Sequence, residues 1–461
     1  MKILLRAAVL LALAAPAFAQ NATPDIQNES NKPEQTQAVQ KNALEALAGS
    51  LGFYDNAAPI SYDDVLAHPD DTDLNYRFAR QQVRQGDLKG AAATLQRILL
   101  IHPDLPKVRL FYAVVLYRLD DLTESQIELQ RLRELQLTDD VRKELDSYAA
   151  AIDKRLKKNH LSGQLGLGWE FDDNRNAVPA SGNLLFANTP IGDATQRTSD
   201  TSLLFLGSVE ERHAFSGNNE ANIGVDYFRS EQTQLKNLNI QAYSVHAGDA
   251  IRTPWDFTVK PTLLFDHALI AQSTFLRDRG ADVRFERKLS QKTLIFADLS
   301  DVFNDYVNAP SFQTAHDFSG VKLNATFGAE RVLSPRQKLT LSAGYEDKHA
   351  FNNIYAYDRG LVDLSHMLLF PGGAFLVSAL SLHYDYYPHP DVFISAYHRT
   401  DKTARLNLTL GSPLTFVHKA LKDVVGTITY EYYWANSSVT NYGYTNNKIA
   451  ALLTYRWDAA F

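Results

Sequence analysis

From residue 161 to the end of the chain, apolar and polar side chains alternate with a period of two. In one such segment Leu406, Leu408 and Leu410 are separated by Asn407 and Thr409. Alternation of this kind places apolar residues on one face of a β-strand and polar residues on the other. Because it recurs through the whole of this region, the pattern predicts an all-β structure with one apolar and one polar face.

Fourteen such segments can be counted, with centres near residues 167, 205, 225, 244, 263, 281, 297, 324, 342, 363, 380, 406, 428 and 452. Each is about ten residues or longer, enough for a tilted strand to cross a bilayer. Tight turns alternate with mostly longer connections, as in an outer-membrane barrel with an even number of antiparallel strands. In the alternative, a soluble sandwich, the apolar faces would pack together in a dry core.

One connection departs from this alternation. Residues 411–422 lie on the side of the short turns yet form a long connection, and residues 413–421 are predicted to form a small periplasmic helix. The mean hydropathy of −0.26 excludes a protein made of repeated apolar helices. It is compatible with barrel strands, whose alternation averages to near-neutral hydropathy.

Residues 1–19 have the pattern of a secretory signal peptide. Two basic residues precede an apolar run, and Ala17 and Ala19 form a small-x-small site that predicts cleavage before Gln20. An uncleaved membrane anchor is the alternative, although the apolar run is short for a bilayer. Residues 20–60 are rich in Asn, Gln, Glu, Lys and Pro, and are predicted to be a disordered linker that contains one short helix.

Between residues 61 and 158 the apolar positions follow a helical period. Ala79 and Ala113 stand 34 positions apart, as do Leu95 and Leu129. A helix–turn–helix unit of this length is typical of tetratricopeptide repeats. Two repeats are visible, and a further amphipathic helix is predicted to cap them. A generic helical hairpin domain is the alternative interpretation.

The repeat positions predict a concave face on this helical domain. With Asp73, the side chains expected there are Tyr76, Arg80, Arg84, Lys107, Tyr117 and Arg118. Tyr and Arg dominate interface hot spots, so the pattern favours a groove that binds a peptide or linker segment. The alternative is a helix face that is simply solvated.

The first barrel segment follows the helical domain directly and has glycine at alternate positions, including Gly168. It ends in a motif whose polar residues are Asp172, Asp173, Asn174 and Asn176. Such oxygen atoms are Ca²⁺ ligands when they converge on one point. The favoured interpretation is that these residues cap the strand and begin a long surface loop, where Asp and Asn bond to nearby backbone.

The last segment has apolar residues at alternate positions that share one register: Leu453, Tyr455, Trp457 and Phe461. A terminal aromatic residue preceded by alternating aromatics resembles the C-terminal signal read by the barrel assembly machinery. Ala459 departs from that pattern, since an aromatic residue is usual two positions before the end.

The order of signal peptide, short repeat domain and fourteen-stranded barrel, together with the Gly-rich strand and Asp-Asn motif, resembles the surface lipoprotein assembly modulators (Slam proteins) of type XI secretion. The resemblance implies an α domain followed by a membrane all-β barrel. It implies the Gram-negative outer membrane as location, with the helical domain in the periplasm. It also implies client lipoproteins or secreted haem- and iron-acquisition proteins as partners, alongside outer-membrane lipid and the barrel assembly machinery.

Composition excludes several other classes. The chain has no cysteine, which removes thiol catalysis, Cys-ligated zinc and iron–sulfur clusters. Acidic residues outnumber basic ones, 53 to 46, which argues against a nucleic-acid partner. No catalytic residue, metal site or cofactor is predicted. Ser381, His383 and Asp385 suggest a hydrolase, but residues two apart on a strand are about 6.6 Å apart, too far for direct hydrogen bonds.

Polar residues at alternate positions are expected to face the lumen and to form ion pairs there: Glu210, Arg284, Glu286, Lys322, Glu330, Glu346, Arg405, Glu431 and Arg456. Their mixed signs argue against an ion pore selective for one sign of charge. The alternative to a protein translocator is a polysaccharide-export or solute channel. The small number of repeats counts against export porins, and a plain uptake porin does not need the helical domain.

Overall fold

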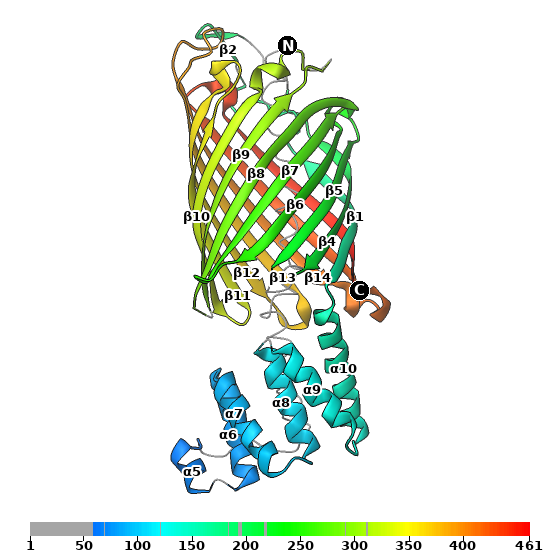
Figure 1. Cartoon of the computed structure of the whole chain (residues 1–461). Helices are drawn as coiled ribbons and strands as arrows, with labels where there is room; N and C mark the ends of the chain where they lie inside the picture. Colours follow the sequence, from blue (N-terminus) through cyan, green and yellow to red (C-terminus); the bar gives the residue numbers. More distant parts are fainter. Residues whose placement is uncertain are drawn as a thin grey trace. The chain divides into compact units, whose positions relative to one another are not determined.

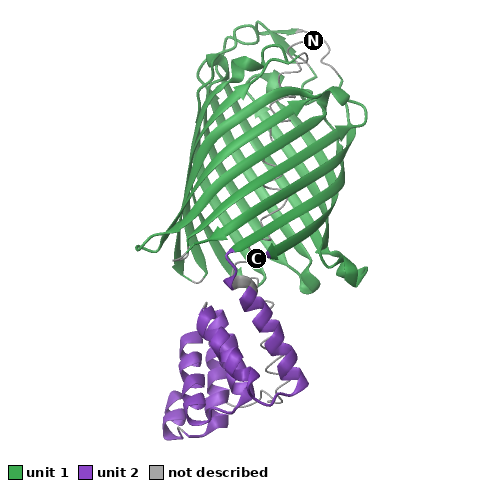
Figure 2. Ribbon diagram, turned by 45° about the vertical axis from the view of Figure 1, so that its right-hand side comes forward, with its two compact units in different colours: residues 1–24, 159–459 green, residues 25–158, 460–461 purple. Residues whose placement is uncertain are grey.

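The computed structural model describes residues 59–461, except residues 69, 120, 183, 192–195, 216–218, 291, 310 and 311. The chain divides into two compact units at the boundary between Lys158 and Asn159, as Figure 2 shows by colour. The predicted signal peptide with its cleavage site, and the linker as far as residue 58, lie outside the described residues.

The first unit consists of α-helices. These are α5 Tyr62–Ala67, α6 Thr72–Gln85, α7 Leu88–Ile101, α8 Pro106–Arg118, α9 Leu122–Arg133 and α10 Asp139–Leu156. The side chains of Asp71, Asp87 and Asp121 cap α6, α7 and α9 by accepting hydrogen bonds from backbone N–H groups three residues later. Gly86 ends α6 with a φ of 84°, a left-handed conformation that glycine adopts without strain. Among the described residues no helix is both long and apolar enough to span a membrane.

The core of this unit explains the 34-residue spacing. Ala79 and Ala113 are completely buried, as are Leu95 and Leu110. Small residues at these repeat positions let paired helices approach closely, and leucines fill the space between pairs. The buried side chain of Glu128 pairs with the guanidinium of Arg109 across the second helix pair. The predicted tetratricopeptide-like helical domain is confirmed.

The second unit is a closed barrel in which fourteen strands are hydrogen-bonded to their neighbours (Figure 1). The strands are β1 Asn159–Asp172, β4 Asp200–Ala214, β5 Glu220–Gln232, β6 Ile240–Arg252, β7 Phe257–Ile270, β8 Ser273–Ser290, β9 Thr293–Tyr306, β10 Gly320–Ser334, β11 Gln337–Lys348, β12 Tyr357–Leu369, β13 Phe375–Tyr387, β14 Arg399–Pro413, β15 Val424–Ser437 and β16 Tyr444–Ala460. All fourteen predicted segments are strands of the barrel, so the predicted fold class is confirmed.

The exposure of side chains alternates along each strand as the sequence pattern requires. On β1, Leu165, Leu167 and Trp169 are 59%, 51% and 46% exposed and point out of the barrel. The intervening Gly166 and Gly168 face the interior, where Leu206 and Leu452 lie against them. An apolar outer face and a closed ladder of backbone hydrogen bonds are what a bilayer demands of a spanning β-structure.

The connections define two rims. The longer ones lie on what we call the long-connection rim, which includes the first loop, residues 173–199, between β1 and β4. Inside the first loop, β2 Leu184–Phe186 and β3 Thr189–Ile191 form a small hairpin. The short-turn rim lies at the opposite strand ends. Its connections include the turns between β10 and β11 and between β12 and β13.

Two connections differ from the simple rule. On the long-connection rim, β7 and β8 are joined by only Ala271 and Gln272, with φ values of 47° and 66°. On the short-turn rim, residues 413–421 do not form one continuous helix as predicted. The chain there forms two short 3₁₀ turns, η5 Leu414–Phe416 and η6 Lys419–Leu421, because His418 between them is extended.

Candidate functional site

The interior wall of the barrel is lined by paired charges of both signs. Arg284 on β8 bonds to Glu286 at 2.6 Å and to Asp298 on β9 at 3.0 Å. Lys260 on β7 reaches Glu286 at 2.9 Å. On the adjoining strands β10 and β11, Lys338 pairs with Glu330 at 3.4 Å. Most of these pairs join adjacent strands along the wall. The interior is therefore polar, and its positive and negative charges are balanced locally.

A second group of charges lies towards the long-connection rim. Arg359, near the start of β12, donates two hydrogen bonds to Asp385 on β13, at 2.7 and 2.8 Å, and one to Glu346 on β11, at 3.2 Å. This bidentate pairing is strong and geometrically specific. It occupies both carboxylate oxygens of Asp385, so that carboxylate is not oriented towards His383, its neighbour on the same face of β13, as a hydrolytic triad would require.

The seam of the barrel is the pairing of its first and last strands, β1 and β16. A Cβ atom placed on Gly168 would lie 2.5 Å from Leu452 Cδ1, and one placed on Gly163 would lie 2.2 Å from the ring of Trp457. From Gly163 to Gly168 the chain advances five residues along β1, and from Trp457 to Leu452 it goes back five residues along β16. The strands are therefore in one antiparallel register, and glycine leaves room for the large side chains that cross it.

A cluster of buried charges reinforces the interior side of the seam. Lys448 on β16 lies 3.6 Å from Asp172 on β1 and 3.9 Å from Glu431 on β15. Arg405 on β14 is 3.9 Å from the second oxygen of Glu431. Arg175, just beyond β1, is 3.7 Å from Asp172. Four strands on both sides of the seam thus share one alternating charge network.

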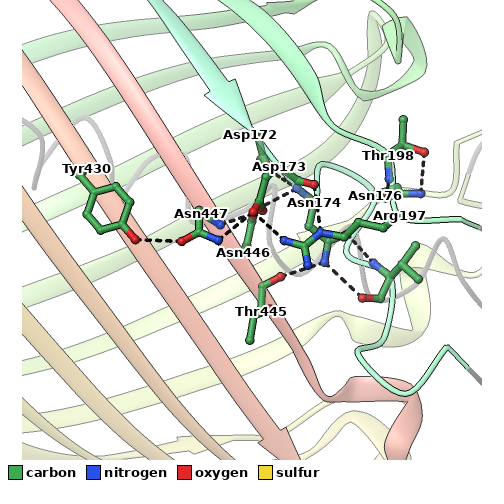
Figure 3. A network of polar contacts seen from close by, with 11 residues as sticks. Asp172, Asp173, Asn174, Asn176, Arg197, Thr198, Tyr430, Thr445, Asn446 and Asn447 are labelled. Atoms are coloured by element: carbon green, nitrogen blue, oxygen red, sulfur yellow. Dashed lines mark hydrogen bonds and ion pairs between the residues drawn. The ribbon is translucent and has the colours of Figure 1, made fainter.

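The polar motif that follows β1 forms a clamp across the seam, shown in Figure 3. The two oxygens of Asp173 accept hydrogen bonds from the backbone N–H and the side-chain amide of Asn447, at 2.8 and 2.7 Å. The backbone N–H of Asp173 donates to the Asn447 carbonyl at 3.0 Å. Arg197 reaches the carboxylate at 2.7 Å. We call Asp173, Asn447 and Arg197 the seam clamp.

The seam clamp is charged under ordinary conditions. Burial raises the pKa of the Asp173 carboxyl, but hydrogen bonds from Arg197 and Asn447 outweigh burial and hold this pKa below its usual range. Its carboxylate is therefore ionised at neutral pH and keeps its pairing with Arg197.

The next residues of the motif fix the start of the first loop. Asn174 is 2% exposed. It donates through its amide to the carbonyls of Val178 and Thr445, at 3.2 and 3.0 Å. Asn176 holds the far end of the loop by exchanging hydrogen bonds with Thr198 N–H and Gln196 O, at 2.9 and 2.8 Å. Throughout the described part of the chain, no group of three or more His, Asp or Glu side chains is arranged to hold a metal ion.

The first loop also bonds to other connections of its rim. Leu185 in the hairpin exchanges two hydrogen bonds with the side-chain amide of Asn441, at 2.7 and 3.2 Å. The N–H groups of Ala187 and Asn188 donate to carbonyls in residues 388–398, at 2.9 and 3.0 Å. Arg175 donates to the carbonyl of Leu238, before β6, at 3.2 Å. The first loop therefore joins connections on both sides of the seam.

The helical unit contains a cavity of about 440 Å³ between α6, α8 and the start of α10. Its apolar walls include Tyr76, Leu105, Val108 and Val141, and Lys107 lies among the polar residues that line it. Burial raises the pKa of Tyr76 to about 12, so its phenol remains a neutral hydrogen-bonding group. A cavity of this size and lining can accept an apolar side chain of an extended segment.

The structure distributes the predicted groove residues over different environments. Tyr76, Lys107 and the accompanying Asp73 line the cavity. Arg80 and Tyr117 are 7% and 5% exposed and contribute to packing, with the Tyr117 ring 6.1 Å from Tyr148. Arg84 is exposed at the end of α6, and Arg118 is partly buried at the end of α8.

The residues of the predicted barrel-assembly signal lie at the end of β16. Leu453 and Tyr455 are 54% and 48% exposed on the outer face. Tyr455 and Trp457 stack at 6.0 Å between ring centroids. Phe461 is 59% exposed and follows the strand, because β16 ends at Ala460.

Sequence reasoning missed the partners of the motif, above all Asn447, Arg197 and Lys448. One signal was present. In β16 the outer-facing positions from Ile449 onwards are apolar or aromatic, whereas position 447 carries an asparagine. A polar residue on the apolar face near a strand end marks a place where the strand bonds to a loop.

Comparison with known proteins found one family model and several similar solved structures. A family model described as tetratricopeptide repeat matches residues 82–143. No curated protein matches the chain. Among solved structures, it is similar to the outer membrane protein OprD from Pseudomonas aeruginosa, at 8% identity and a TM-score of 0.34, over 66% of this chain and 94% of that one.

Two further solved structures are similar. OccAB4 of Acinetobacter baumannii has 8% identity and a TM-score of 0.31, over 66% of this chain and 99% of that one. A bacterial polysaccharide outer membrane secretin has 10% identity and a TM-score of 0.35, over 64% and 98% of the two chains. The strand topology and the apolar outer face define the class by themselves: a barrel of the outer-membrane type preceded by a tetratricopeptide-like domain.

Proposed function

We propose that this protein is an outer-membrane translocator that delivers client proteins, either surface lipoproteins or secreted haem- and iron-acquisition proteins, to the surface of a Gram-negative cell. The helical domain stands in the periplasm and captures the client. The client passes through the barrel interior, and the first loop is the structure it must displace at the long-connection rim. The observation that carries the proposal is the union, in one chain, of a repeat domain that has an apolar cavity and a closed barrel that has a polar interior.

Capture depends on the covalent order of the two units. Helix α10 ends at Leu156 and β1 begins at Asn159, so only Lys157 and Lys158 separate them. A client segment held in the cavity between Tyr76, Val108 and Val141 is tethered to the barrel by a very short connection. Tethering raises the local concentration of the client at the barrel without any additional contact.

The interior is the favoured route because the seam is closed. The strands β1 and β16 are hydrogen-bonded neighbours, so the barrel has no open edge between them. The seam clamp and the Lys448 cluster add polar and charged contacts between β1 and β16. The inner wall offers paired charges of both signs, which a polypeptide of mixed composition can pass without being held by one sign of charge.

A polysaccharide-export or solute channel is the second candidate. The observation in its favour is the same mixed-sign polar wall, which suits an uncharged polar solute. The repeat domain and its cavity favour the translocator, since a solute channel has no use for an apolar capture site.

The test is surface display in a two-gene reconstitution. The full chain is expressed in a laboratory Gram-negative host with a candidate client, and intact cells are probed with protease and with antibody against the client. We expect the client at the surface only when this protein is present. A client that stays in the periplasm beside a folded, heat-modifiable barrel, together with sugar or solute flux in bilayers, would support the channel instead.

A further inference from the structure

The connection between β14 and β15, residues 414–423, is the exception among the short turns of its rim. It carries η5 and η6 and exposes two large apolar side chains, Phe416 at 75% and Val417 at 62%. In Figure 1 this segment, coloured orange, turns outward from the foot of the barrel wall. A turn that only joins two adjacent strands does not require exposed apolar side chains. Their exposure therefore suggests that this segment contacts a partner.

The exposed side chains continue the lipid-facing surface of the barrel. On the flanking strands, Leu410 and Ile428 point outward and are 52% and 58% exposed. Leu414 packs beside the start of β15, with its Cδ2 atom 3.3 Å from the position of a Cβ on Gly426. Leu414 therefore joins the start of the connection to the apolar outer face of β15.

The connection is also basic. Lys419 and Lys422 are exposed, with His418 beside them, and Asp423 is the single acidic residue of the segment. Apolar and aromatic side chains followed closely by lysines are the pattern of segments that lie in a membrane interface. Lysine stems extend along apolar surface while the ammonium groups reach headgroups.

We propose that residues 414–423 are an interfacial anchor that docks on the phospholipid leaflet next to the short-turn rim and prefers anionic headgroups. Phe416 and Val417 enter the boundary between headgroups and acyl chains. Lys419 and Lys422 contact the phosphates. The partner is a lipid surface, because both the continuity with the barrel wall and the charge of the segment match one.

The chain has no cysteine, so a single one can be labelled without any background. A nitroxide is attached to Val417→Cys in the full-length protein, refolded into vesicles of phosphatidylethanolamine and phosphatidylglycerol. Collision rates with oxygen, which partitions into lipid, and with a water-soluble nickel complex are then compared. The matched control is Phe393→Cys, an exposed position on a connection of the opposite rim. Heat-modifiable migration confirms that each variant is folded.

We expect oxygen to dominate relaxation at residue 417 and nickel to dominate at residue 393. Equal nickel access at both positions would overturn the proposal and would indicate that a protein partner covers this face.

In a second variant, Lys419→Glu and Lys422→Glu are combined with the label at residue 417. We expect a lower oxygen-to-nickel ratio with anionic vesicles and no change with neutral ones. An unchanged ratio in anionic vesicles would refute the preference for anionic headgroups.

Discussion

Removal of the carboxylate of the seam clamp, by Asp173→Ala, should open the first loop and leave the barrel intact. The substitution eliminates three side-chain contacts: two from Asn447, at 2.8 and 2.7 Å, and one from Arg197, at 2.7 Å. In the seam clamp, Asn447 and Arg197 act as hydrogen-bond donors to the Asp173 carboxylate. Without the carboxylate, these donors lose their shared acceptor. The β1 and β4 ladder does not involve this side chain.

The size of the effect follows from burial. A hydrogen bond to a charged group contributes about 1.5–3 kcal/mol when buried. Asp173 and Arg197 have side chains that are 26% and 44% exposed, so solvent screening limits their pair to at most about 1 kcal/mol. Together the lost contacts amount to about 2–3 kcal/mol of local stability, since the contacts share one carboxylate. That corresponds to opening about 30- to 150-fold more often.

Hydrogen–deuterium exchange of the refolded, full-length protein measures this opening directly. Amides in residues 173–182 and 444–448 should exchange about 30- to 150-fold faster in the variant, and amides in the middle of β9 should not change. Asp423→Ala, which removes an exposed carboxylate on the opposite rim, is the matched control. Unchanged exchange around residue 173 would show that the clamp does not hold the loop.

The same loop should respond to acid. The folded-state pKa of Asp173 is lowered, so its contribution is fully present above the unfolded value near 3.9. It is lost as the pH falls through the folded pKa. Wild-type exchange in the first loop should therefore rise selectively in that acidic range and approach the rate of Asp173→Ala. Parallel pH profiles for wild type and variant would contradict this reasoning.

Three further results are expected. Gly163→Ala should weaken the seam, because the added Cβ would lie 2.2 Å from the Trp457 ring. Adding Trp457→Ala should restore normal heat-modifiable migration. Failure of this rescue would mean that the Trp457 ring is not the obstacle. Arg359→Met should destabilise the barrel by about 3–5 kcal/mol in urea titrations, because it removes the cation that bonds directly to two buried carboxylates, Glu346 and Asp385. A stability within about 1 kcal/mol of wild type would refute this role. Thr138→Trp should fill the helical cavity and reduce client display, whereas Leu100→Trp, at a position 79% exposed, should not; equal display by both variants would exclude the cavity from capture.

The architecture follows from local patterns. Strand alternation and the 34-residue spacing depend on residues close together in the sequence, so all fourteen strands and the repeat domain could be predicted. The turn at Ala271 and Gln272 could not, because a two-residue hairpin with positive φ usually carries Gly or Asn. A small helix was predicted after β14, but its division into two 3₁₀ turns has no distinctive signal.

The site was less predictable because its contacts join distant segments. The motif after β1 was recognised as the start of a loop, but its principal partner, Asn447, is 274 residues away in the chain. In the helical domain, repeat position alone could not separate Tyr76, which lines the cavity, from Tyr117, which packs in the core. Both side chains are buried, and they differ only in their tertiary neighbours: Tyr117 contacts Tyr148 of α10, whereas Tyr76 borders the cavity.

The central claim, passage of a client through the barrel interior, is tested most directly by site-specific cross-linking during transport. A photoreactive group is attached to a single cysteine at Asn324, which faces the interior of β10, or at Leu323, which is 42% exposed on the outer face. A third position, Leu453, samples the outer face of the seam. A client stalled in transit should cross-link from residue 324 and from neither of the others. Cross-links from residue 453 without any from residue 324 would contradict the claim and place the route at the seam.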